Sequence, residues 1–117
     1  MKYKIDNIKN YSGKRDWLCG HFFEEGDLSK TEALEVKVST MKKGDFDKEH
    51  FHPQGTEIVV ILKGELRYRL EGKEYIVSDG DFVILRNQVK EEVVEALKET
   101  TYIVARAPSI KNNKTYT

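Results

Sequence analysis

Two of the chain's three histidines lie two residues apart, and a glutamate follows them closely. The stretch reads "HFHPQGTEIVVILKG" and contains His50, His52 and Glu57. Residues two apart in a strand project to the same face, so both imidazoles would point the same way. If the strand that begins at Glu57 pairs antiparallel with the one before it, the carboxylate returns beside them. Two histidines and one carboxylate on one face suit iron, manganese, zinc or nickel and leave open positions for water and substrate.

A plainer interpretation of the same residues has no metal. In it, His50 and His52 only flank the turn from Pro53 to Thr56, and Glu57 is solvated at the end of a strand. The elements around these residues bear on the choice between the two interpretations.

Those elements are predicted to be strands. Apolar and polar residues alternate with the period of a half-buried strand in "LEVKVS" and in "ELRYRL", and Glu71-Gly72 after the second has the form of a two-residue hairpin turn. Further strands are expected at "FVILR", "KEEVVEAL" and "TTYIVARA", with a turn at "SDGD". Short strands at such spacing, with turn residues between them, indicate an all-β sandwich or barrel.

The run from Ile58 to Leu62 is apolar on both faces, which predicts a central strand. One face would look into the interior, and the other would be covered by a second sheet or by a partner subunit. A homodimer is therefore expected.

The glycines that flank the histidines complete a recognisable motif. Gly44, His50, His52, Glu57 and Gly64 stand at the spacing G-x5-H-x-H-x4-E-x6-G. This resembles the first motif of the cupin superfamily. The resemblance extends over roughly residues 30 to 106 and implies a small, all-β double-stranded β-helix, also called a jelly-roll or cupin barrel, of antiparallel strands. It also favours the metal interpretation of the histidines.

The second cupin motif is degraded. It would begin at Gly80, but the positions of its proline, second glycine, histidine and asparagine are held by Arg86, Gln88, Glu91 and Glu95. The resemblance thus places Glu91 where a third metal-binding histidine is usual, and a divalent metal held by His50, His52, Glu57 and Glu91 is the hypothesis. In a regular strand Glu91 shares a face with Val89, Val93 and Glu95, whereas Glu92 points the other way. Alternatively, Glu91 and Glu92 are ordinary surface charges.

Two further residues are candidates to line the pocket. In "WLCGHFF", His21 shares a face with Trp17, Cys19 and Phe23, and this stripe either lines the barrel opening or belongs to the core. His21 could supply a hydrogen bond or a proton near neutral pH. Tyr68 alternates with Leu66 and Leu70, which predicts that it points inward.

Composition bounds the remaining possibilities. The 117 residues suit a single domain, with N-terminal strands over 1–30, a barrel core over about 31–107 and a loose polar tail at 108–117. Twenty basic residues balance twenty acidic ones, which argues against nucleic acid or membrane partners. One cysteine and an amino terminus without an apolar core predict a cytoplasmic protein.

Three functions follow as hypotheses. The first is a metal-dependent enzyme for a small polar substrate of sugar or carboxylate type, because isomerases, epimerases, decarboxylases and oxygenases occur among the cupins that this chain resembles. The second is a binding, sensor or accessory protein without turnover. The third is a dimerisation scaffold with a vestigial site, against which the retained His50, His52 and Glu57 argue.

Overall fold

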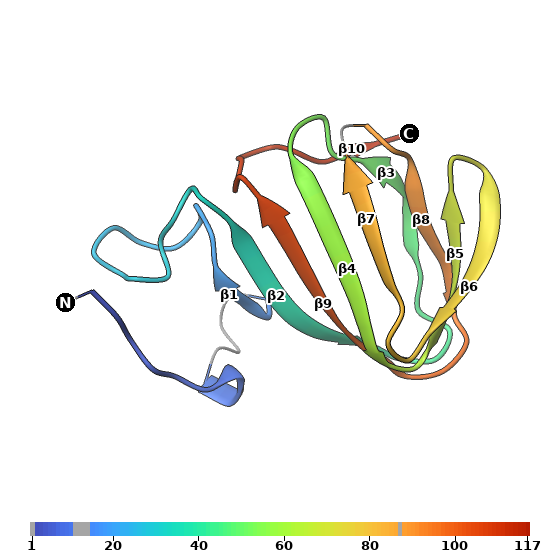
Figure 1. Cartoon of the computed structure of the whole chain (residues 1–117), viewed down its shortest axis with the longest axis horizontal. Coiled ribbons are helices and arrows are strands. Elements are labelled where there is room, and N and C mark those ends of the chain that lie inside the picture. Colours follow the sequence, from blue (N-terminus) through green and yellow to red (C-terminus); the bar gives the residue numbers. More distant parts are fainter. Residues whose placement is uncertain (1, 11–14, 87) are drawn as a thin grey trace.

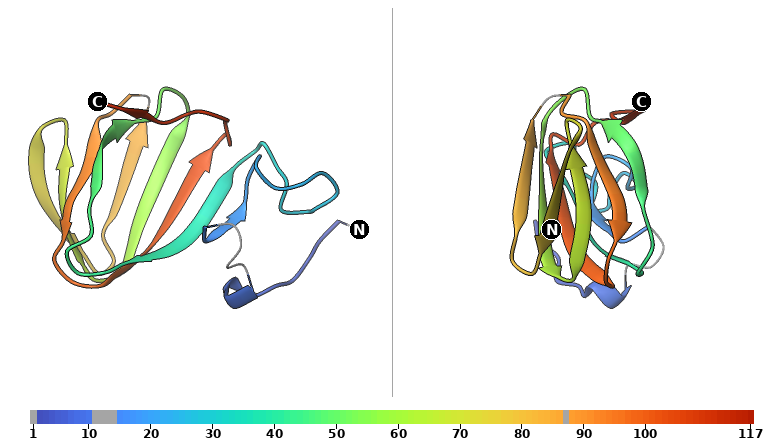
Figure 2. Two further views of the ribbon diagram at one scale, coloured as in Figure 1. Left: turned by 180° about the vertical axis from the view of Figure 1, so that it is seen from behind. Right: turned by 90° about the vertical axis from the view of Figure 1, so that its right-hand side faces the viewer.

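Two five-stranded antiparallel sheets lie face to face in the computed structural model, which describes residues 2–10, 15–86 and 88–117 (Figures 1 and 2). The first sheet has the strand order β1-β2-β9-β4-β7, and the second has the order β10-β3-β8-β5-β6. The strands are β1 Trp17–Cys19, β2 Glu35–Met41, β3 Asp47–Phe51, β4 Thr56–Lys63, β5 Glu65–Leu70, β6 Lys73–Ser78, β7 Phe82–Arg86, β8 Glu91–Ala96, β9 Thr100–Ala107 and β10 Thr115–Tyr116. The predicted all-β double-stranded β-helix is confirmed.

Helical structure within the described residues is limited to one short 3-10 turn, Ile8–Asn10. None of these residues forms a helix with the length and apolar character needed to cross a membrane.

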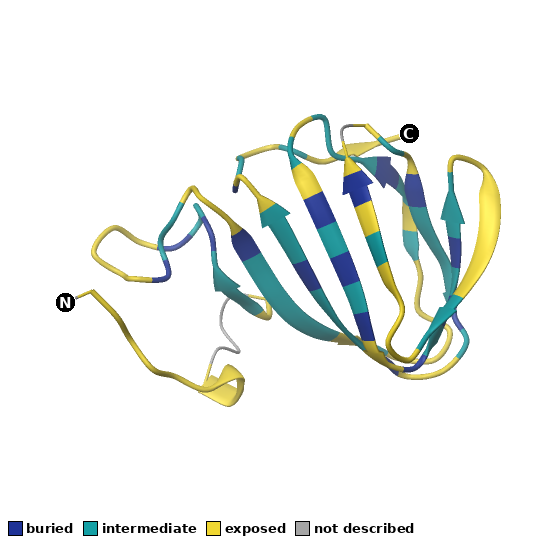
Figure 3. Ribbon diagram, in the orientation of Figure 1, coloured by how far each residue is buried: buried dark blue, intermediate teal, exposed yellow. Residues whose placement is uncertain are grey.

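Strand β4 is central, as its sequence predicts. It pairs with β7 on one side and β9 on the other, and its buried positions alternate along the strand at Glu57, Val59 and Ile61 (Figure 3). Two of these inward side chains, Val59 and Ile61, belong to the hydrophobic core, whose other buried members are Leu66, Tyr68, Ala96 and Val104.

Two turns show why glycine is needed. At the β5–β6 hairpin, Glu71 and Gly72 both have positive φ, 49° and 81°, which is the backbone of a primed two-residue turn. At Gly64, between β4 and β5, φ is 125° and a Cβ would lie 2.5 Å from the Cα of Thr100. No other residue type fits there without moving the neighbouring strand.

Strand β2 alternates as predicted, but its polar face is the one that looks into the sandwich. Lys37 and Met41 line the interior cavity between the sheets, whereas Val38 lines a groove with Ile8 and Leu18 of the N-terminal segment. The interior on this side is therefore charged rather than apolar.

The two ends of the chain differ from expectation. The N-terminal region, predicted to form strands over 1–30, contains one strand, β1, within its described part; residues 1 and 11–14 lie outside that part. The strand ends at Cys19, and Gly20, which has positive φ, follows it directly. The C-terminal tail is not loose, because β10 pairs with β3 and sets Tyr116 opposite His50.

Candidate metal centre

Four predicted residues reach the site from three strands and one loop. His50 is in β3, His52 follows the end of β3, Glu57 is in β4 and Glu91 is the first residue of β8. The β3–β8 pairing sets Glu91 directly opposite His50. His50, His52 and Glu91 each offer a ligand atom, and these atoms lie within 4.8 Å of one another.

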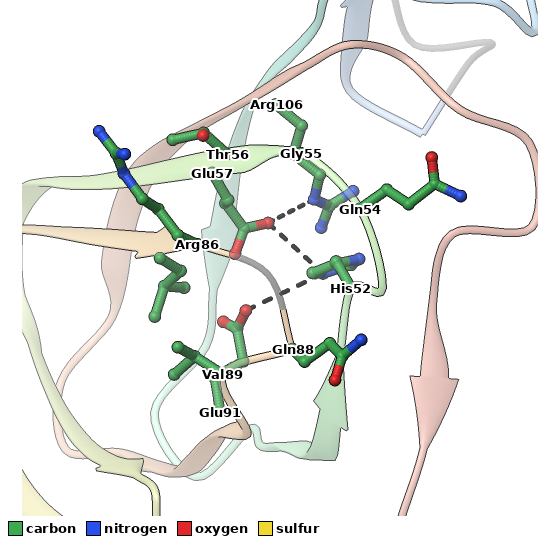
Figure 4. A pocket seen from close by; sticks show the side chains of 11 residues that line it. His52, Gln54, Gly55, Thr56, Glu57, Arg86, Gln88, Val89, Glu91 and Arg106 are labelled. Carbon is green, nitrogen blue, oxygen red and sulfur yellow. Dashed lines mark hydrogen bonds and ion pairs between the residues drawn. The ribbon is translucent and has the colours of Figure 1, made fainter.

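The separations between these atoms suit a shared ion. Oε2 of Glu91 lies 3.8 Å from Nε2 of His50. The same oxygen lies 3.9 Å from Nε2 of His52, and that nitrogen lies 3.5 Å from Oε2 of Glu57 (Figure 4). Ligand atoms that each stand about 2.0–2.2 Å from a metal are themselves roughly 3–4 Å apart.

Both imidazoles are held with Nε2 towards the site. Nδ1 of His50 lies 2.7 Å from the carbonyl oxygen of Lys48, and Nδ1 of His52 lies 2.6 Å from that of Asn113. A carbonyl oxygen only accepts, so each Nδ1 carries the proton and each Nε2 keeps its lone pair. Burial lowers the pKa of both histidines, and the charge of Arg106 lowers that of His52 further. Both are therefore neutral, as metal ligands must be.

Three buried polar atoms of the site have no hydrogen-bond partner in the described chain. They are Nε2 of His52, Oε1 of Glu57 and Oε2 of Glu91. Leaving such an atom unsatisfied costs about 1–3 kcal/mol each. A divalent cation among them would satisfy atoms from all three residues, so the donor set fits a metal.

Tyr68 orients the Glu91 carboxyl. Its hydroxyl donates to Oε1 of Glu91 at 2.5 Å, which leaves Oε2 to face the histidines. Tyr68 is only 2% exposed, and burial together with the Glu91 charge raises its pKa well above the ordinary value. The phenol therefore stays protonated and acts as a donor.

Arg106 holds Glu57. Its Nε donates to Oε2 of Glu57, and its Nη1 lies 2.8 Å from Oε2 of the buried Glu35. Glu57 therefore keeps Oε1 free while Oε2 is shared with a guanidinium. Sequence reasoning did not single out Arg106, although the alternation in "TTYIVARA" places it on the inward face with Tyr102 and Val104.

The pKa values of the two site carboxyls are shifted in opposite directions. Burial and the neighbouring Glu57 raise the pKa of Glu91 to about 9. Burial alone would also raise the pKa of Glu57, but its interactions with Glu91 and Arg106 outweigh burial and hold that pKa below its ordinary value. Glu91 is therefore the protonated member of the pair near neutral pH.

The other acidic residues of β8 face away. Glu92 pairs with Arg69 at 2.8 Å on the outer surface, as expected for the face opposite Glu91. Glu95 was predicted to share the face of Glu91, but it pairs with Arg67 at 3.9 Å, and both side chains are more than 40% exposed. The reason is a register shift between β5 and β8 beside Val93, which reverses the facing of the residues that follow.

The site contains a small gap and borders a larger cavity. A gap of about 10 Å³ lies between His52, Glu57 and Glu91, room for about one water-sized body (Figure 4). The interior cavity, of about 230 Å³, is lined by His50, Glu57, Tyr68 and Glu91 among others.

His21 lies elsewhere. It lines another cavity, of about 300 Å³, with Trp17 and Phe22, and His52 and Arg106 also line this cavity. Nδ1 of His21 is 2.7 Å from Oγ of Ser109. The predicted common face of Trp17, Cys19, His21 and Phe23 is interrupted because β1 ends at Cys19.

Solved structures with a similar fold support the architecture. A conserved protein with a double-stranded β-helix domain from Klebsiella pneumoniae has 17% identity and a TM-score of 0.73, covering 98% of this chain and 97% of its own. KdgF from a Halomonas species has 20% identity and a TM-score of 0.64, covering 70% of this chain and 74% of its own. DMSP lyase DddQ from Ruegeria pomeroyi has 22% identity and a TM-score of 0.66, covering 75% of this chain but 45% of its own.

Sequence comparison adds the family. No curated protein matches the sequence. The family described as "Cupin domain" matches residues 37–96, just over half of the chain, and this span contains His50, His52, Glu57 and Glu91. The chain belongs to the cupin domain family.

Proposed function

We propose that this cupin binds a divalent metal through His50, His52 and Glu91, with Oε1 of Glu57 as the fourth ligand, and acts on a small polar substrate. The observation that carries the proposal is the set of buried, unpartnered acceptors on His52, Glu57 and Glu91. A bound divalent metal supplies Lewis-acid or redox chemistry to a substrate oxygen.

The protein's own groups set up the site. The carbonyl groups of Lys48 and Asn113 fix the imidazole tautomers, Tyr68 orients Glu91, and Arg106 orients Glu57. The interior cavity beside these residues gives the substrate its place. Isomerase, epimerase and oxygenase chemistry are all compatible with such a site, and one protein of similar fold is a lyase.

A specific observation supports a second candidate, a binding protein without turnover. Three groups near the site could serve as a general base, and each is engaged or lies to one side. Glu57 is bound by Arg106, Glu91 is a proposed metal ligand, and His21 lines another cavity. Unless a substrate or metal-bound group supplies the base, the same cavity would hold a small molecule without converting it.

The first experiment is metal analysis of protein purified without chelator or a metal-affinity tag. We expect close to one equivalent of a transition metal. Replacing Glu91 by glutamine keeps its size and removes its charge, so metal affinity should fall at least tenfold, whereas Glu91→His should hold metal at least as well as the native chain.

Glu92→Gln is the matched control, because Glu92 lies next in sequence but faces outward. It should leave metal affinity unchanged. Equal losses at positions 91 and 92, or none at either, would contradict the role given to Glu91. Absence of metal from the native protein after incubation with manganese, iron(II), zinc and nickel would remove the metal proposal itself.

We also infer that the protein is a homodimer. The outer face of the first sheet is apolar and exposed at Phe82 and Ile84, and no described part of the chain covers it.

A further inference from the structure

Lys37 stands out in the wall of the interior cavity. It lies in β2 opposite Val104 of β9, and its side chain lines the same cavity as His50 and Glu91. Its Nζ lies over two aromatic rings, 5.1 Å from the centre of Trp17 and 5.9 Å from that of Tyr102. Among the described ion pairs, none involves Lys37.

The other cations near the cavity are already neutralised. Arg106 is shared between Glu35 and Glu57, and Lys114 lies 3.7 Å from Asp47. Burial lowers the pKa of Lys37, and the charges of Arg106 and Lys114 lower it further. The charges of Asp47 and Glu57 act in the opposite direction, but neither carboxylate forms an ion pair with Lys37. Lys37 is thus a partly desolvated ammonium group that faces two aromatic rings and has no ion-pair partner among the described residues. Such a group is costly to keep unless an anion joins it.

The balance of charges around the cavity indicates the charge of that anion. With a dication bound, the ion, Lys37, Arg106 and Lys114 carry five positive charges, against four on Glu35, Asp47, Glu57 and Glu91. One positive charge is left uncompensated, and Lys37 carries it. A monoanion such as a carboxylate balances the cavity, whereas a phosphate dianion would exceed the balance.

Part of the cavity wall is apolar. Val59, Leu66 and Val104 line it, and all three belong to the core cluster. The cavity, at about 230 Å³, is smaller than the roughly 300–1,000 Å³ typical of sites for drug-sized ligands. A short carbon skeleton therefore suits the space better than a full sugar chain or a large aromatic ligand.

We propose that the interior cavity binds a small monocarboxylate whose anionic group is received by Lys37 and whose other oxygen donor faces the His50–Glu91 end. The placement of that second oxygen and the charge balance that favours a monoanion rest on the proposed metal function, whereas the contact of an anionic group with Lys37 rests on the absence of an ion pair at that lysine in the described part of the chain. The substrate would then be a short carboxylic acid rather than any small polar molecule.

The test compares carboxylates with their neutral amides. Glycolate, 3-hydroxypropanoate and 4-hydroxybutanoate, each beside its primary amide, are titrated calorimetrically into native protein, with metal and after chelation. We expect at least one acid to bind roughly tenfold or more tightly than its amide, the value of one hydrogen bond to a charged group. Inorganic phosphate should bind more weakly than that acid.

Variants assign the preference to one side chain. Lys37→Met keeps the stem that packs on Trp17 and Tyr102, so the melting temperature should be unchanged or higher, while the preference for acid over amide disappears. Lys37→Arg should retain the preference, and so should Lys63→Met, which removes an exposed lysine of β4. Metal binding should be the same in all three.

The outcomes separate the two proposals. Equal binding of acids and amides by the native protein, or a preference that survives in Lys37→Met, would overturn the inference even if metal binds. The native protein could instead bind no metal, while the chelated protein still prefers acids to amides through Lys37. That result would support the carboxylate site and contradict the metal function.

Discussion

Glu91 carries a proton in the metal-free protein, and a metal ion must displace it. The pKa of this carboxyl is raised to about 9, so over most of the physiological range the free site is in the wrong state to bind. His50 and His52, whose pKa values are lowered, are already neutral and lose no proton there. Metal binding should therefore release close to one proton.

The apparent affinity of the site for metal should depend on pH. Because the proton on Glu91 competes with the metal, apparent affinity should rise roughly tenfold per pH unit from about pH 7 until the pH approaches the pKa of Glu91. Calorimetry in buffers of different ionisation enthalpy measures the protons released. In Glu91→His the dependence should be nearly flat above pH 7. A flat profile in the native protein would mean that Glu91 is ionised before metal arrives or is not a ligand.

Some residues of the site can be found from the sequence, and others cannot. The spacing of His50, His52 and Glu57 is visible in the chain because β3 and β4 are consecutive strands. The expected antiparallel pairing of these two strands is wrong, since β3 belongs to the second sheet and β4 to the first, and Glu57 meets the histidines across the interior between the sheets. Lys37 and Arg106 are different. Each is one charge in an alternating strand, and only the pairing of β2 with β9, and of β9 with β4, brings Arg106 against Glu35 and Glu57.

At the scale of elements, the C-terminal segment belongs to the site. The backbone carbonyl of Asn113 accepts from His52, and the Asn113 side chain bonds both the amide and the carbonyl of Gln54 at 3.0 and 2.8 Å. The loop that carries His52 is thus tied to residues far along the chain. Polar composition suggested a loose tail, but these polar groups are what tie it to the sheet.

The second prediction follows from that clamp. Asn113→Ala removes both side-chain bonds to Gln54 and frees the segment that orients His52. Metal affinity should fall about tenfold, at the lower end of the effect of losing an outer-shell partner. Lys111→Ala, an exposed change in the same segment, should have no effect. If both variants bind metal like the native protein, the clamp does not position His52.

The order of the strands is well predicted from the sequence. The face of the sheet on which each side chain lies is predicted less well. The strands around "ELRYRL", "FVILR" and "TTYIVARA" and the Glu71-Gly72 turn follow from local pattern. The facing of Glu95 does not, because a one-residue register shift between β5 and β8 has no local signature in "EEVVEA". The polar face of β2 lies inward because it lines the interior cavity, and the alternation within one strand does not show which of its two faces lies inward.

At the scale of the whole molecule, the sandwich has one uncovered apolar face. On the outer side of the first sheet, paired strands bring Ile84, Ile58 and Ala105 into one row across β7, β4 and β9. Phe82, Val60 and Ile103 form a parallel row beside it. Neither row contains a charge, and depletion of charge is what distinguishes the centre of an interface from ordinary surface. The second sheet covers only the inner side of these strands.

We predict a two-fold dimer through this face, which would account for the apolar residues on both sides of the run from Ile58 to Leu62. Ile84→Lys would place a lysine from each subunit in the interface, so the dimer dissociation constant should rise roughly a hundredfold or more. Sedimentation at micromolar concentration measures it. Ile76→Lys is the matched control, since Ile76 and Ile84 are both 55% exposed but Ile76 lies in β6 of the other sheet. A dimer broken only by Ile76→Lys would place the interface on the second sheet, and a monomeric native protein would mean that these rows face solvent.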